Sequence, residues 1–116
     1  MDKNQKVFNM KFADIYTLYK KKITSKSRTT DELNFVIKWL TGFDDEGLKK
    51  QIAEEVTLEA FFANAPLINT NANLIAGLIC GCKIEAIENP LMKKIRQMDK
   101  LVDGLAKGRQ LEKILP

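Results

Sequence analysis

Histidine is absent from this sequence of 116 residues, and its absence removes several classes of active site. Ser–His and Cys–His nucleophile pairs cannot form, and neither can a zinc site that uses imidazole. The chain also lacks the side chain that most often serves as a general acid or base near neutral pH. Catalysis would have to rely on carboxylates, lysine, tyrosine or cysteine. We therefore favour a non-enzymatic function.

Long apolar runs are also missing. The longest candidate, Leu74 to Cys82, is about half the ~20 residues that a helix needs to span a bilayer. The first ten residues, MDKNQKVFNM, lack the apolar stretch of a secretory signal. These observations predict a cytoplasmic protein that does not contact a membrane. In the cytoplasm, cysteines remain free thiols.

Cysteine is scarce, and both cysteines stand in the stretch GLICGCKI at residues 77–84. Structural zinc sites need four ligands, usually with cysteine pairs two to four residues apart. Cys80 and Cys82 have one residue between them, and no second pair exists. Packing within the core is the simpler interpretation, with Cys80 buried and Cys82 the exposed or boundary thiol. Redox sensing is the alternative, and we expect no metal or cofactor.

The charges are unevenly distributed along the chain, although 29% charged and 45% hydrophobic residues are typical of one globular domain. Residues 1–28 hold eight basic and two acidic residues, whereas residues 29–66 hold three basic and eight acidic ones. Residues 67–116 are basic again, and the net charge is +4. The sequence therefore predicts a molecule with an acidic and a basic side.

Apolar residues at three- and four-residue spacing predict helices over most of the chain. We expect residues 1–10 to form a flexible N-terminal arm and residues 11–116 a single α-helical domain. The expected helices are residues 11–24, 30–41, a short helix after Asp44, another between Thr57 and Pro66, a long helix over 90–107 and a last turn near 111–115. Residues 74–82 are either a buried helix or a strand, and we favour the helix because a lone strand would have no partner.

Capping residues mark several helix ends. Thr29 with Glu32 three positions later matches the capping box, and Gly42 stands where a left-handed C-terminal residue is expected. Asn89 followed by Pro90 is typical of a helix start. Helices of this length, joined by short loops, predict an all-α fold. We expect a small orthogonal or irregular bundle of about five or six helices.

Four stretches together resemble one small bacterial family. They are WLTGF at 39–43, FFANAPLIN at 61–69, LIAGLICG at 74–81 and the stretch from Ile84 to Leu115. The chain from about Val7 onward is similar to the family catalogued as domain of unknown function 2200. This resemblance implies an all-α domain and no activity, substrate or partner. Cys82 and Gly104 depart from the apolar and acidic residues that we expect in relatives.

Basic residues gather in two places that would suit phosphates. A solvated helix face is the simpler interpretation, because Asp99 and Asp103 can pair with basic residues three or four positions away. The basic residues that would form such a surface are Lys20, Lys21, Lys22, Lys26, Arg28, Lys93, Lys94, Arg96, Lys100 and Lys107.

Two functions follow from these patterns. The first is a non-enzymatic protein-interaction domain whose partner is another protein, with a second copy of the chain as one candidate. The second is a weak nucleic-acid-binding accessory protein that uses the basic helices. A helix-turn-helix around TGFDD is disfavoured, because Asp44, Asp45 and Glu46 would repel phosphates.

Overall fold

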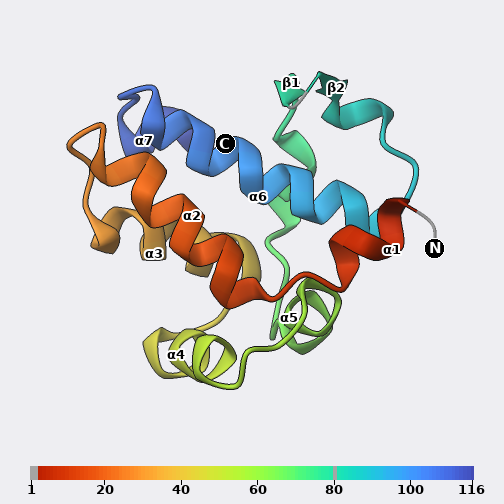
Figure 1. The fold of residues 1–116 in the computed structure, drawn as a ribbon. Helices are drawn as coiled ribbons and strands as arrows, with labels where there is room; N and C mark the ends of the chain where they lie inside the picture. Colours follow the sequence, from red (N-terminus) through yellow and green to blue (C-terminus); the bar gives the residue numbers. More distant parts are fainter. Residues whose placement is uncertain (1–2, 80) are drawn as a thin grey trace.

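The computed structural model describes residues 3–79 and 81–116, which form seven α-helices, two 3-10 helices and one two-stranded hairpin (Figure 1). The α-helices are α1 (Lys3–Phe8), α2 (Phe12–Thr24), α3 (Thr30–Thr41), α4 (Asp45–Ala53), α5 (Leu58–Asn64), α6 (Pro90–Ala106) and α7 (Leu111–Ile114). The remaining elements are the 3-10 helices η1 (Thr70–Leu74) and η2 (Ile84–Ala86) and the strands β1 (Leu78–Ile79) and β2 (Cys82–Lys83).

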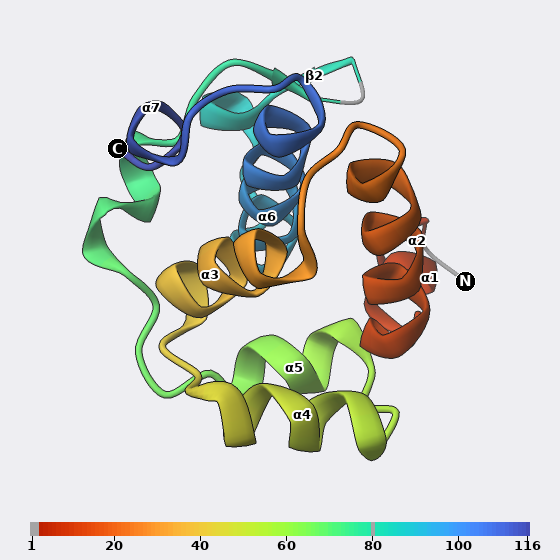
Figure 2. The same ribbon diagram turned by 90° about the vertical axis from the view of Figure 1, so that its left-hand side faces the viewer.

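The long helix α6 is central, and α2, α3, α5, α7 and η2 all contact it. The helices point in several directions rather than along one axis (Figures 1 and 2). Helices α4 and α5 lie at one end of the molecule and the hairpin at the other (Figure 1). The prediction of an irregular all-α bundle is confirmed.

Aromatic side chains fill the part of the core beneath α2. The rings of Phe12 and Phe61 stack with centroids 3.8 Å apart, and Phe43 and Phe62 each lie 5.1 Å from Phe61. Burying one such side chain contributes roughly 1.5–3 kcal/mol. The contact joins helices whose sequence positions are about fifty residues apart, and it orients α5 against α2.

The predicted helix ends are confirmed at both of the best-marked helices. Thr29 accepts a hydrogen bond from the Glu32 amide and the Glu32 carboxylate accepts one from the Thr29 amide. Gly42 is left-handed with φ of +79°. At the start of α6 the Asn89 side chain accepts from the Met92 amide, at 2.9 Å. Each side-chain cap stabilises its helix by about 1 kcal/mol.

Residues 3–8 form helix α1 where the sequence predicted a flexible arm. Phe8 is buried in the common core, and Val7 packs against that core. The chain after α1 is held by two backbone hydrogen bonds, from Phe12 to Val56 and from Leu58 to Met10. The flexibility of residues 1–10 stays a prediction, whereas residues 3–8 are helical and contact the core through Val7 and Phe8.

The buried helix that we predicted over residues 74–82 is not formed. The described residues of this segment run from the end of η1 into a β-hairpin. Gly77 and Gly81 have φ of +104° and +78°, which a right-handed helix excludes. Strand β1 pairs antiparallel with β2, with Leu78 opposite Lys83 and Ile79 opposite Cys82. Cys80, predicted to be buried, lies outside the described residues.

Long-range contacts stabilise this hairpin. The Lys100 ammonium donates to the Leu78 carbonyl at 2.9 Å, and the Glu85 carboxylate accepts from the Gly77 amide at 3.0 Å. Ile79 and Ile84 are buried in the core. In the described part of the chain, no helix combines the length and the apolar character needed to cross a membrane.

Candidate functional site

The predicted basic surface is divided by ion pairs within the protein. Between α2 and α6, Asp103 accepts from Lys107 at 3.0 Å and from Lys22 at 3.4 Å. Burial by itself raises the pKa of Asp103, but the hydrogen bonds and charges of Lys107 and Lys22 outweigh this effect, so the pKa is lowered. Lys22 thereby links α2 to α6, whereas Lys107 pairs with Asp103 at the end of the same helix.

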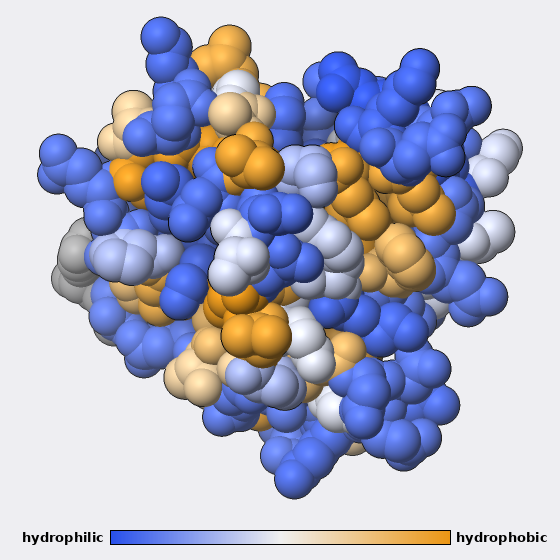
Figure 3. All heavy atoms as spheres, turned by 180° about the vertical axis from the view of Figure 1, so that it is seen from behind, coloured by the Kyte–Doolittle hydropathy of each residue, from blue (hydrophilic) through white to orange (hydrophobic). Residues whose placement is uncertain are grey.

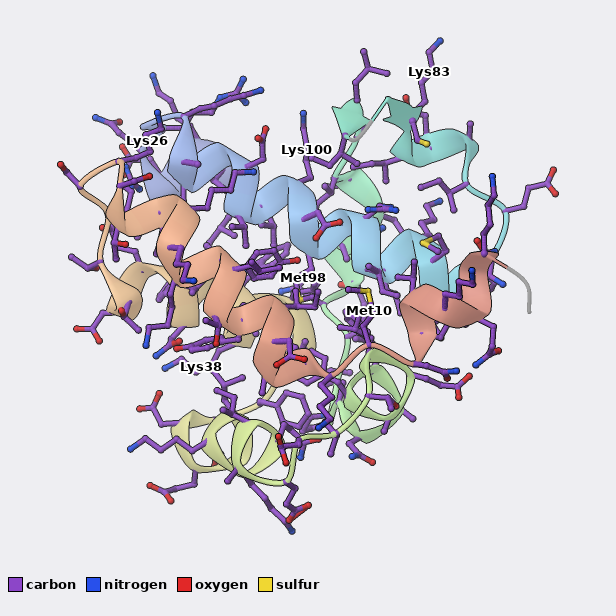
Figure 4. The ribbon with its side chains drawn as sticks, in the orientation of Figure 1. Met10, Lys26, Lys38, Lys83, Met98 and Lys100 are labelled. Atoms are coloured by element: carbon purple, nitrogen blue, oxygen red, sulfur yellow. The ribbon has the colours of Figure 1, made fainter. Side chains whose placement is uncertain are left out.

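Four more of the predicted residues also have partners within the chain. Arg96 pairs with Asp99 at 3.0 Å, as its three-residue spacing predicted. Arg28 pairs with Glu32 at 2.8 Å, and the Lys20 ammonium lies 5.8 Å from the Tyr16 ring. Lys100 reaches toward the hairpin (Figure 4), where it donates to the Leu78 carbonyl.

Each of Lys22, Arg96 and Lys107 therefore has a carboxylate partner on α6, either Asp99 or Asp103. Lys93 and Lys94 line a hollow beside the segment that follows α5. Lys21 and Lys26 are exposed on and just after α2. Nucleic-acid binding by these residues stays a prediction.

Cys82 is an exposed free thiol on β2. Its strand partner is Ile79, whose side chain is buried, whereas Cys82 points to solvent. Redox chemistry at this thiol is untested, and its exposure agrees with the boundary position that the sequence predicted.

Sequence reasoning missed a hollow beside the exposed face of α3, with a volume of about 470 Å³. Phe35 of α3 is 49% exposed although it is a large apolar side chain. Trp39 follows it by four residues and is half-buried, so both rings lie on one face of the helix. The residues that line the hollow, which we call the aromatic hollow, are Phe35, Lys38, Trp39, Phe43, Asp44 and Asp45.

Charged residues border the aromatic hollow. Asp44 caps α4 by accepting from the Gly47 amide at 2.7 Å. Lys38 donates to Asp45 at 2.7 Å, and this hydrogen bond lowers the pKa of Asp45. The position of Lys38 near α4 is visible in Figure 4. The signal in the sequence was the pair of aromatics at Phe35 and Trp39, because Phe35 stands outside the apolar stripe of α3.

The comparisons with known proteins identify the family. Residues 6–116 match the family described as "Uncharacterized protein conserved in bacteria (DUF2200)". The chain belongs to this family. It is also similar to a solved structure, "Crystal structure of uncharacterized protein SP1917", with 39% identity and a TM-score of 0.90. That likeness covers 99% of this chain and 93% of the other. No match is found among curated proteins.

The family match confirms the resemblance that the sequence suggested. Gly104, where we expected an acid in relatives, packs against α7. A Cβ atom there would lie 3.1 Å from Cγ1 of Ile114. In this member of the DUF2200 family, a glycine allows α7 to lie close against α6.

Proposed function

We propose that this DUF2200 protein is a protein-interaction domain whose docking surface is the aromatic hollow. The observation that carries the proposal is Phe35, an aromatic side chain that is 49% exposed beside half-buried Trp39. Aromatic residues are enriched where proteins bind one another, and they dominate the energy of such contacts. The view from behind shows that hydrophobic surface gathers in several places between hydrophilic side chains (Figure 3).

The partner is a second copy of the chain. The aromatic hollow is bordered by Asp44 and Asp45, and Glu46 follows them in the chain. Helix α2 carries a surface of opposite character: Leu18 is 57% exposed, and Lys21 stands three positions later on the same face. Leu18 of one copy would enter the aromatic hollow of another while Lys21 meets its acidic border.

A cytoplasmic location belongs to the same proposal. Cys82 is an exposed free thiol, and the reducing cytoplasm preserves such thiols.

Light scattering after size-exclusion chromatography tests the docking surface. We expect the protein to self-associate at micromolar concentrations, and Phe35→Ser and Leu18→Ser each to abolish this association. The control is Leu78→Ser, because Leu78 is 61% exposed on the hairpin at the other end of the molecule. Its association should equal that of the parent protein.

Mixing the two deficient variants makes the test sharper. Phe35→Ser retains Leu18, and Leu18→Ser retains the aromatic hollow, so one intact contact can form between them. The mixture should therefore recover association that neither variant shows alone. A parent protein that is strictly monomeric would exclude the second copy as partner, and loss of association by Leu78→Ser alone would place the contact elsewhere.

A further inference from the structure

A second hollow, of about 330 Å³, lies between α6 and the segment that follows α5. Figure 2 shows this segment running along the side of the molecule away from α2. Pro90, Lys93, Lys94 and Gln97 contribute one face of α6, because their spacing of three, four and seven residues aligns them. The other wall consists of Ile68, Asn69, Thr70, Ala72 and Asn73. The volume falls within the range of ~300–1,000 Å³ typical of small-molecule sites.

Gln97 is the most unusual residue of this hollow. It is 2% exposed, yet its carboxamide makes no hydrogen bond with any residue that the structure describes. Among the described residues, Nε of Arg28 is the one buried side-chain atom without a hydrogen-bond partner, so the Gln97 carboxamide reaches the space of the hollow and is not sealed in the core. Because Gln97 lines the hollow, a molecule bound there would provide a hydrogen-bond partner for its carboxamide.

Two lysines add positive charge at the same place. Lys93 and Lys94 are half-buried and make no ion pair within residues 3–79 and 81–116. They lie near the N-terminal end of α6, where the helix dipole is already positive and the first turn holds no acidic residue. Positive side chains are unfavourable at this end of a helix, so the arrangement favours a bound anion.

The lining of the hollow is rich in hydrogen-bond donors and contains no acidic side chain. Asn69 accepts from the Asn71 amide through its side-chain oxygen, at 2.8 Å, which leaves its NH2 group to donate. The Thr70 hydroxyl and the Gln97 NH2 group are further donors. The carboxylate of Glu85 interacts with the charge of Lys93, but it accepts a hydrogen bond from the Gly77 amide at 3.0 Å.

The geometry points to a binding site for a phosphate group, either free or carried on a nucleoside. Lys93 and Lys94 neutralise the phosphate, and the side chains of Asn69, Thr70 and Gln97 donate hydrogen bonds to its oxygens. Ile68 and Pro90 offer an apolar surface for the body of a larger ligand. This site shares no residue with the aromatic hollow, so the two proposals stand or fall separately.

Titration monitored by 15N–1H NMR spectra tests the site. The probes are inorganic phosphate and adenosine monophosphate, each at constant ionic strength maintained with sodium chloride. We expect saturable shifts confined to the amides of residues 68–73 and 91–97. Tighter binding of the nucleotide would identify a carried phosphate, and equal binding would identify the free anion. No saturable shift in either series would overturn the proposal.

Matched variants separate a site from general attraction to positive charge. Lys93→Gln with Lys94→Gln should weaken binding about tenfold for each lysine removed, the size of one charge-assisted hydrogen bond. Lys49→Gln with Lys50→Gln removes the same charge from the exposed face of α4 and should leave the affinity unchanged. Equal weakening by both pairs would show nonspecific binding and overturn the site.

Gln97→Leu provides a second and independent measurement. The substitution removes the buried carboxamide, so it should weaken phosphate binding while the protein without ligand remains folded in thermal unfolding. Unchanged affinity in this variant would show that Gln97 does not contact the ligand and would overturn its role in the site. The lysine variants keep the proposal testable if this variant fails to fold.

Discussion

The Tyr19 hydroxyl of α2 donates a hydrogen bond to the Asp99 carboxylate of α6, across eighty positions of sequence. Tyr19 is buried, and the Asp99 side chain is 18% exposed and also accepts from Arg96 at 3.0 Å. Because a charged acceptor strengthens a hydrogen bond, this contact does more than fill space between the two helices. It fixes how α2 lies along α6, next to the ion pair of Lys22 with Asp103.

The first prediction concerns this contact. Tyr19→Phe should lower the free energy of unfolding by about 1–3 kcal/mol, because it removes a hydrogen bond to a charged group. Urea denaturation measures the change. The matched control is Tyr16→Phe, whose hydroxyl donates to the neutral side chain of Asn34. The control should lose less stability, about 1 kcal/mol, and a larger loss in the control would contradict the role of Asp99.

The second prediction concerns Asp103 and acid. Its pKa in the folded protein is lowered from the ordinary value of 3.8. The unfolded chain therefore takes up the proton first as the pH falls. The stabilisation is complete above the unfolded pKa and is lost as the pH falls through the folded pKa. Asp103→Asn should lower the free energy of unfolding at neutral pH by about 1 kcal/mol, since its lysine partners are largely exposed.

Denaturation curves across the acidic range measure this effect. Below about pH 4 the stability of Asp103→Asn should fall less steeply than that of the parent protein. Glu54→Gln is the control, because Glu54 is an exposed carboxylate for which the described residues form no ion pair. If Asp103→Asn and the parent protein had the same dependence on pH, the ion pairs of Asp103 would not stabilise the fold.

The third prediction compares two glycines with the same backbone conformation. Gly42 and Gly108 both have φ of +79°. An alanine at either position incurs the cost of a left-handed conformation, roughly 1 kcal/mol. At Gly42 its Cβ would also lie 2.8 Å from the Leu67 carbonyl oxygen, whereas nothing lies within 4 Å at Gly108.

Thermal or chemical denaturation should therefore rank the two variants. Gly108→Ala should lose about 1 kcal/mol and Gly42→Ala at least about 2 kcal/mol, because the backbone around Leu67 must move. Similar losses in both variants would show that the approach of Leu67 to Gly42 contributes little to stability.

The fourth prediction concerns the exposed thiol. In a Cys80→Ser variant, Cys82 should react with a thiol reagent in the native state at nearly the rate of the unfolded chain, because the folded protein leaves it exposed. Mass spectrometry of the labelled peptide identifies the site, and a variant with both cysteines replaced provides the background. Reaction only after unfolding would show that Cys82 is protected.

Local signals predicted most of the helix boundaries. The capping box of Thr29 with Glu32 and the start of α6 at Asn89 and Pro90 depend on residues within one turn, so the sequence contains all the groups involved. The hairpin and α1 were missed for the opposite reason. Gly77 and Gly81 fit a slim helix as well as a turn, and the contact that favours the turn comes from Lys100, more than twenty residues away.

The candidate sites were predicted less well than the fold. The spacing of Asp103 and Lys107 predicted their ion pair, but the partners of Lys20 and Lys22 were not predicted. The sequence grouped Lys93 and Lys94 with the other basic residues, although in the structure these two lysines line the hollow between α6 and the segment that follows α5. The sequence gives the number and order of charged side chains, but the partner of each one depends on how the helices pack.

The sequence by itself determined the all-α class, the ends of the main helices and the pairing of Arg96 with Asp99, because all of these depend on neighbours within a few residues. It also excluded chemistry that needs histidine. Only the tertiary structure decided that Tyr19 meets Asp99, that Phe35 stays exposed and that Gln97 is buried beside two lysines. The meeting of Tyr19 with Asp99, the exposure of Phe35 and the burial of Gln97 all depend on how helices distant in sequence pack on one another.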